Sequence, residues 1–186
     1  KNWFDETFIK KIGSINFCGN FGDPTNATEM IEIVEYFYNT NNDIKIEIHT
    51  NGGARNTDFW SKLGKLSEKS DKRIFVVFSI DGLEDTNHLY RRNVKWDKVM
   101  KNMKAYVKSG ALGIWDYLIF KHNEHQIDDC QNIANRLKFK KFQVKHTSRF
   151  INGKFHALDE QGRTTHILYP TSRSEDMVSK VIENYS

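Results

Sequence analysis

The sequence predicts an α/β fold built around a parallel sheet, and two observations support that prediction. Apolar, β-branched runs alternate with helical patterns along the chain, at the spacing of about 30 residues that is typical of a βα repeat. Four of these runs end in a cluster of polar and glycine residues. Because parallel strands place their carboxyl ends on one face, we expect the four clusters to form one shared site.

The individual elements follow from the apolar periodicity. Strands are expected at the apolar runs 14–18, 44–50, 73–80, 114–120 and 141–147. Helices are expected where apolar residues recur at helical spacing, at 27–39, from Thr57 onward, at 95–109 and at 124–137. Asn26 or Thr28 could cap the first of these helices. After Phe150 the sequence predicts turns and a short helix from about Ser174, a connector or the start of another module.

The bulk properties indicate one folded domain. A length of 186 residues suits a single core, and 38% hydrophobic with 13% aromatic residues is typical of globular proteins. No apolar stretch approaches the roughly 20 residues that span a bilayer. No signal-peptide pattern follows Lys1. The cysteine usage favours reducing conditions, so we expect a cytoplasmic protein without a membrane partner. Since the first residue is not Met, we interpret the amino terminus as a truncation.

The net charge and the cysteine spacing argue against nucleic-acid-binding, disulfide-rich and zinc-binding proteins. The net charge is only +4, and basic residues gather only between Lys138 and Arg149. Alternation of apolar and basic residues there favours a strand with lysines facing solvent over a nucleic-acid surface. Cys18 and Cys130 form no CxxC pair, so the spacing supports neither a disulfide framework nor a zinc site. We expect Cys18 to be buried in a strand and Cys130 to lie in the core.

The four strand ends offer complementary polar groups. Asp23 lies beside glycines that permit a tight turn, and its carboxylate could hold an ammonium group. Asn51 supplies an amide suited to ribose hydroxyls, Asn123 adds another amide, and the segment Ser79–Gly82 adds a hydroxyl and a carboxylate. The guanidinium of Arg91 is a natural partner for a ligand carboxylate. This inventory fits an amino-acid-bearing nucleoside such as S-adenosylmethionine.

At these positions the chain resembles the radical S-adenosylmethionine enzymes. Phe21-Gly22-Asp23-Pro24 is similar to the family's Gly-Gly-Glu-Pro segment, with Phe and Asp in place of Gly and Glu. Thr50-Asn51-Gly52 is similar to the family's Thr-Asn-Gly, and Ser79-Ile80-Asp81-Gly82 to its fourth-strand segment. Arg91 follows Ser79 by 12 positions (91 − 79), like the family's Ser and Arg pair. Asn123 resembles the asparagine that follows the fifth strand.

The resemblance implies a (β/α)6-type partial TIM barrel over residues 1–150, with its first strand missing and a C-terminal extension over 151–186. It implies that the cofactor is bound by Gly22, Asp23, Pro24, Asn51, Ser79, Asp81, Arg91 and Asn123. Asp23 would hold the ammonium, Ser79 and Arg91 the carboxylate, and the two asparagines the ribose region. The implied partners are S-adenosylmethionine, an electron donor protein, and a peptide or protein substrate.

The family's [4Fe-4S] cluster has no ligands in this sequence. Its CxxxCxxC motif is absent, and two cysteines cannot supply three thiolates. We therefore expect the cluster loop upstream of Lys1, either removed or lost, and no catalytic or metal-binding residue within the chain. In the complete enzyme, the resemblance implies that the reduced cluster splits the cofactor to a 5′-deoxyadenosyl radical that abstracts hydrogen. The chain alone is expected to be inactive.

Two alternatives remain open at this point. A metal-dependent hydrolase on a (β/α) barrel would use His49, Asp81, His122 and His125 around a divalent ion. A catalytically dead remnant would bind only the cofactor or a partner protein, in keeping with the missing cysteines.

Overall fold

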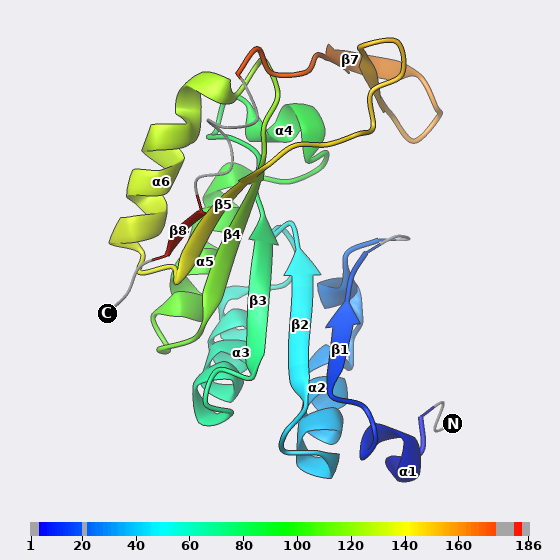
Figure 1. The fold of residues 1–186 in the computed structure, drawn as a ribbon, viewed down its shortest axis with the longest axis vertical. Coiled ribbons are helices and arrows are strands. Elements are labelled where there is room, and N and C mark those ends of the chain that lie inside the picture. Colours follow the sequence, from blue (N-terminus) through cyan, green and yellow to red (C-terminus); the bar gives the residue numbers. More distant parts are fainter. Residues whose placement is uncertain (1–3, 20–21, 174–180, 184–186) are drawn as a thin grey trace.

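A computed structural model describes residues 4–19, 22–173 and 181–183 of the chain. Its main sheet has the strand order β1-β2-β3-β4-β5-β8 (Figure 1). The first five strands are parallel neighbours, and they are β1 Ser14–Phe17, β2 Lys45–Thr50, β3 Ile74–Ser79, β4 Gly113–Leu118 and β5 Lys141–Lys145. β8, Val181–Glu183, pairs antiparallel with β5. The five parallel strands confirm the predicted α/β class.

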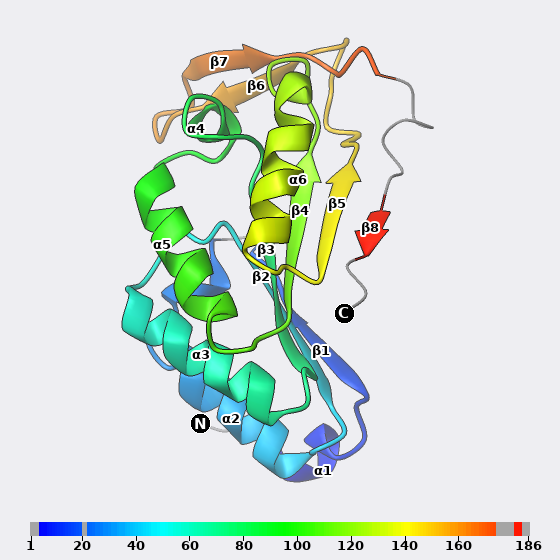
Figure 2. The same ribbon diagram turned by 90° about the vertical axis from the view of Figure 1, so that its left-hand side faces the viewer.

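Helices pack against one face of this sheet (Figure 2). They are α2 Met30–Thr40, α3 Thr57–Lys69, α5 Trp96–Val107 and α6 Ile127–Arg136. The chain also contains the short helices α1 Glu6–Ile9 and α4 Asn87–Tyr90 and the 3-10 turns η1 Pro24–Asn26 and η2 Glu124–Gln126. The core lies between the helices and the sheet. There Trp60 of α3 contacts Phe78 of β3, with ring centroids 5.2 Å apart, and both are fully buried. Burial of such aromatic residues contributes most of the stabilising apolar area.

The opposite face of the sheet carries polar side chains. Along β2, Ile46, Ile48 and Thr50 are buried beneath the helices, whereas the alternating Glu47 and His49 are half-buried on the other face. No helix of the described chain covers that face (Figure 2). Parallel sheets are normally covered on both faces, so an uncovered face that carries polar residues indicates the interior of a curved, barrel-like sheet. The arrangement is a partial TIM-barrel-like fold with an open sheet.

Two local expectations are wrong. α2 begins at Met30, and its N-cap residue, Glu29, makes no capping side-chain bond. Asn26 lies in the preceding 3-10 turn and the Thr28 hydroxyl donates to Glu29, so neither residue caps the helix. Cys18 is exposed because β1 ends one residue earlier, at Phe17. Cys130 is buried, as predicted.

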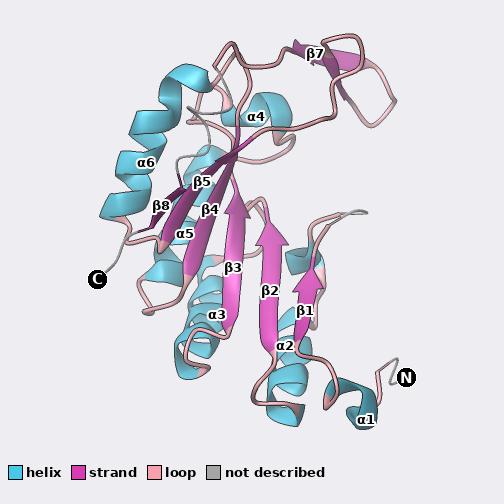
Figure 3. Ribbon diagram, in the orientation of Figure 1, coloured by secondary structure: helices cyan, strands magenta, loops and turns pink. Residues whose placement is uncertain are grey.

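The extension after Phe150 contains more regular structure than its turn residues indicate. β6, Phe155–Leu158, and β7, Thr164–Leu168, form an antiparallel hairpin near the carboxyl ends of the parallel strands (Figure 3). The segment that follows β7 contacts the β4–α6 loop, where the Lys121 N–H donates to the Tyr169 carbonyl over 3.0 Å. The short helix expected from Ser174 lies outside the described residues. Among the helices that are described, none is long and apolar enough to cross a membrane.

Candidate binding site

A cavity of about 530 Å³ lies at the carboxyl ends of the parallel strands. Six of the eight predicted site residues line it, namely Gly22, Asp23, Pro24, Asn51, Ser79 and Arg91. The other lining residues are Cys18, Gly19, His49, Thr50, Tyr90, Asp116, Leu118, Lys145 and Arg149. The strand ends therefore form one shared cavity. Its volume is in the range of cofactor pockets.

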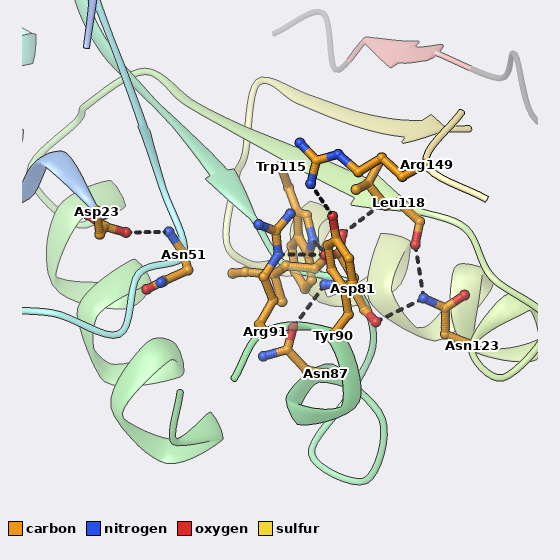
Figure 4. A network of polar contacts seen from close by, with 11 residues as sticks. Asp23, Asn51, Asp81, Asn87, Tyr90, Arg91, Trp115, Leu118, Asn123 and Arg149 are labelled. Atoms are coloured by element: carbon orange, nitrogen blue, oxygen red, sulfur yellow. Dashed lines mark hydrogen bonds and ion pairs between the residues drawn. The ribbon is translucent and has the colours of Figure 1, made fainter. Parts of the chain in front are cut away.

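Asp23 joins the first strand end to the second. Its Oδ1 accepts hydrogen bonds from the Thr25 N–H (3.0 Å) and the Thr25 hydroxyl (2.5 Å). Its Oδ2 accepts from the Thr50 hydroxyl over 2.8 Å. It also accepts from the Asn51 N–H over 2.8 Å (Figure 4). All of these donors are neutral, and in the described part of the chain no basic side chain pairs with the carboxylate. Asp23 therefore brings an uncompensated negative charge to the cavity.

Arg55 fixes the loop that follows Asp23. Its guanidinium donates to the carbonyls of Thr25 (Nε, 2.6 Å), Asn26 (Nη2, 3.0 Å) and Ala27. Gly22 has φ +134°, and a Cβ there would meet nothing within 4 Å, so its backbone faces open space. This role of Arg55 was not predictable from the sequence, because its partners lie about 30 positions away along the chain.

The Thr50-Asn51-Gly52 turn is held from below by a helix. The Asn51 Oδ1 accepts the Gly53 N–H (2.8 Å), and the Thr50 hydroxyl accepts the Gly52 N–H (3.0 Å). Gly52 has φ +70°, a conformation that favours glycine. The buried Asn102 of α5 donates to the Gly52 carbonyl over 2.8 Å. Turn chemistry was predictable here, whereas the support from Asn102 was not.

Asp81 lies beneath the cavity in a buried network. Its carboxylate is fully buried, and accepts from the Arg91 Nε and from the Leu118 N–H, both over 2.6 Å (Figure 4). Its own N–H donates to the Asn87 Oδ1 over 2.9 Å. Burial raises the pKa of Asp81, and the Arg91 charge and the Leu118 hydrogen bond oppose that rise. The Asp81 side chain thus orients Arg91 and does not line the cavity.

Asn123 is also buried and has an internal role. Its Nδ2 donates to the carbonyls of Asp81 and Leu118, both over 2.9 Å, and its Oδ1 accepts the Phe120 N–H over 2.7 Å. These bonds tie the end of β4 to the end of β3 (Figure 4). The structure therefore places Asn123 next to Asp81 and outside the cavity lining.

The polar residues on the far side of the cavity were not predicted from the sequence. Asp116, in the middle of β4, accepts from Lys145 Nζ over 2.5 Å and from Gln143 Nε2 over 3.0 Å. Arg149 Nη1 donates to the Tyr90 hydroxyl over 2.7 Å. A carboxylate inside the otherwise apolar run 113–118 was the available signal for Asp116. Nothing comparable distinguishes Tyr90 or Arg149 in the sequence.

The residues of the alternative metal site, His49, Asp81, His122 and His125, form no metal-binding group in the described part of the chain. His49 Nε2 pairs with the Glu47 carboxylate over 2.5 Å. Both ring nitrogens of His122 are buried without a hydrogen-bond partner among the described residues, and burial lowers the pKa of this imidazole from 6.5 to about 4. Across residues 4–19, 22–173 and 181–183, no three His, Cys, Asp or Glu side chains are grouped to hold a metal ion. This geometry gives the metal-hydrolase alternative no support.

Solved structures with the same fold provide a comparison. The structure of anSMEcpe with bound AdoMet (S-adenosylmethionine) matches with a TM-score of 0.59 at 16% identity, over 86% of this chain and 43% of that chain. Streptococcus suis SuiB bound to S-adenosylmethionine matches with a TM-score of 0.59 at 22% identity, over 73% of this chain and 30% of that chain. TYW1 with a lysine-pyruvate adduct bound matches with a TM-score of 0.52 at 14% identity.

By sequence, the chain matches no protein-family model and no curated protein. The chain spans less than half the length of anSMEcpe and SuiB. At these identities, likeness to solved structures establishes the fold alone. The chain therefore has the fold that these three proteins share, and anSMEcpe and SuiB were solved with S-adenosylmethionine bound.

Proposed function

We propose that the cavity binds S-adenosylmethionine and that the chain is part of a radical S-adenosylmethionine enzyme. The observation that supports this most strongly is the convergence of Asp23, Asn51, Ser79 and Arg91 on one cavity. They come from consecutive strand ends and from the α4 region. The negative charge of Asp23, which is held only by neutral donors, matches an ammonium on the ligand. The Ser79 hydroxyl and the Arg91 guanidinium match a carboxylate on the same ligand.

Each lining residue has a proposed part in binding. The methionyl ammonium contacts the Gly22-Asp23-Pro24 segment, whose charge is uncompensated. The methionyl carboxylate contacts the Ser79 hydroxyl and Arg91, whose Nε is already fixed by Asp81. Asn51 lies at the ribose region. Asp81 and Asn123 act as positioning residues because their side chains bond to the protein beneath the cavity.

The cluster must come from outside this sequence. Cys18 lines the cavity and Cys130 is buried in the core, so the two thiols are not placed to share one cluster. We propose that a strand upstream of β1 carries the CxxxCxxC motif. A cluster held by the three cysteines of that motif would supply the one electron needed for reductive cleavage of S-adenosylmethionine. The residues of this chain bind and orient the cofactor and exclude water.

We further propose a cytoplasmic enzyme that receives electrons from a donor protein and acts on a peptide. Two of the neighbours were solved with peptides, SuiB with the precursor peptide SuiA and anSMEcpe with the Cp18Cys peptide. The cavity opens beside the exposed residues Lys145 and Arg149, which leaves room for a second ligand.

Ser79→Ala tests the cofactor assignment. Ser79 is half-buried, and its hydroxyl bonds to no other described side chain or backbone group, so its removal should leave the fold intact. Loss of one hydrogen bond to a charged carboxylate should weaken S-adenosylmethionine binding by about tenfold or more. Equilibrium dialysis would measure the affinity. Ser14→Ala, at the exposed opposite end of β1, is the matched control. Equal affinities in both variants and in the wild type would refute the assignment.

A further inference from the structure

We infer that the side of the cavity formed by Tyr90 and Arg149 is a subsite for a carboxylate on the substrate. This inference rests on the proposed function, because it concerns the second ligand of the same cavity. Figure 4 shows Asp23 and Asn51 on one side of the view and Tyr90 with Arg149 well apart from them. All four residues line the cavity. The proposed cofactor contacts, Asp23, Asn51, Ser79 and Arg91, do not include Arg149, so Arg149 is left for another group.

Arg149 differs from the other two cations of the cavity, Arg91 and Lys145, in its ion pairing. Arg91 pairs with the Asp81 carboxylate at 2.6 Å, and Lys145 pairs with the Asp116 carboxylate at 2.5 Å. Arg149 bonds instead to a phenol, the Tyr90 hydroxyl, at 2.7 Å. Within the described ranges, no carboxylate lies within ion-pair distance of its guanidinium. Arg149 is thus the cation of the cavity whose charge is uncompensated.

Tyr90 holds this guanidinium in place. The Tyr90 ring packs against Phe120 (4.9 Å between centroids) and Phe155 (5.4 Å), and the Arg91 guanidinium lies over it at 5.0 Å. A ring with three such neighbours has a fixed position, so its hydroxyl fixes one N–H of Arg149. The guanidinium has five N–H donors, and a planar carboxylate can accept two of them at once.

The chemistry favours a carboxylate ligand at this point. A preorganised guanidinium loses less entropy on binding than a free one, and the arginine fork matches carboxylate geometry. Two sources would present this group on a peptide, an acidic side chain or the chain terminus. We assign the subsite to an acidic side chain, because Arg149 and Lys145 are exposed at the cavity mouth, where a continuing peptide could pass on both sides.

Three acetylated tripeptides test the inference, titrated into the full-length protein saturated with S-adenosylmethionine. They are Ac-Ala-Glu-Ala-NH2, Ac-Ala-Gln-Ala-NH2 and Ac-Ala-Gln-Ala with a free carboxyl terminus. The glutamyl peptide should bind at least about tenfold more tightly than its neutral glutaminyl counterpart. Arg149→Gln should reduce that ratio to about one, whereas Arg92→Gln, a neighbouring arginine outside the cavity lining, should preserve it.

The other outcomes overturn the inference. Equal binding of the glutamyl and glutaminyl peptides, or binding of neither, refutes the subsite. Preference for the peptide with the free terminus refutes the assignment to a side chain. The affinity for S-adenosylmethionine, measured on the same samples, distinguishes a failure of the subsite inference from a failure of the proposed function. Arg149→Gln should leave that affinity unchanged, and a loss would place Arg149 in the cofactor site instead. A wild-type protein that does not bind S-adenosylmethionine refutes the proposed function itself.

Discussion

Replacing Arg91 by glutamine should destabilise the fold as well as the site. The Asp81 carboxylate is fully buried and its Oδ2 accepts from the Arg91 Nε over 2.6 Å. Without the guanidinium, a buried charge would keep only the Leu118 N–H as a partner on its side chain. Breaking one side of a buried ion pair costs about 3–5 kcal/mol. That is a large part of the roughly 5–15 kcal/mol by which a domain is stable.

Urea unfolding followed by tryptophan fluorescence would measure this cost, because Trp60 and Trp115 are fully buried. The double variant Asp81→Asn with Arg91→Gln removes both charges and keeps an oxygen that can accept the Leu118 N–H. It should recover most of the lost stability. Arg92→Gln is the control and should change the unfolding free energy by less than about 0.5 kcal/mol. A single-variant loss below about 1 kcal/mol, or a double variant no more stable than Arg91→Gln, would refute the reasoning.

The remaining predictions concern the titration of His122, the anchoring of residues 169–173 by Glu124, and the reactivity of the Cys18 thiol. Because burial lowers the pKa of His122 to about 4 in the folded protein against 6.5 normally, the unfolded chain binds more protons between these values. The free energy of unfolding should keep its full value above pH 6.5. It should fall by up to about 2 kcal/mol as the pH drops toward 4, after allowance for solvent screening. His122→Phe should abolish this loss in acid unfolding curves and His125→Gln, at an exposed histidine, should not. Partial burial alone would raise the pKa of Glu124, but hydrogen bonds from Thr171 and Ser172 lower it. Glu124→Ala should therefore speed proteolysis within residues 169–173 without unfolding the sheet, and an unchanged cleavage rate would contradict this anchoring. Cys18 is exposed and lines the cavity, whereas burial raises the pKa of the Cys130 thiol. Iodoacetamide should modify Cys18 first, and S-adenosylmethionine should slow that reaction; equal rates with and without the cofactor would count against its placement.

Much of the fold follows from local pattern. The apolar runs and helical periodicity identify the five parallel strands and the helices between them, because each element buries one face. β6, β7 and β8 are not apparent from the sequence, since they are short and depend on distant partners. β8, for example, pairs with β5 about 40 residues earlier. Turn residues such as Gly162 predicted turns here and not the β6–β7 hairpin. A glycine at φ +78° nevertheless suits the turn that joins two strands.

The position of the candidate site was predictable from the sequence, but the burial and contacts of its residues were predictable only in part. Polar strand ends locate Asp23, Asn51 and Ser79, because the carboxyl ends of parallel strands share a face. Burial of Asp81 and Asn123 was not apparent, since an Asp-Gly pair also occurs in exposed turns. Their partners are 37 and 42 positions away in the chain, and only the folded structure brings these groups together.

A crystal structure of the protein with S-adenosylmethionine would test the central claim most directly. The account predicts that the methionyl ammonium lies at the Gly22-Asp23-Pro24 segment and the carboxylate within hydrogen-bond distance of Ser79 and Arg91, with Arg149 left without a cofactor contact. A cofactor bound elsewhere, or one whose carboxylate contacts Arg149 in place of Ser79 and Arg91, would contradict it.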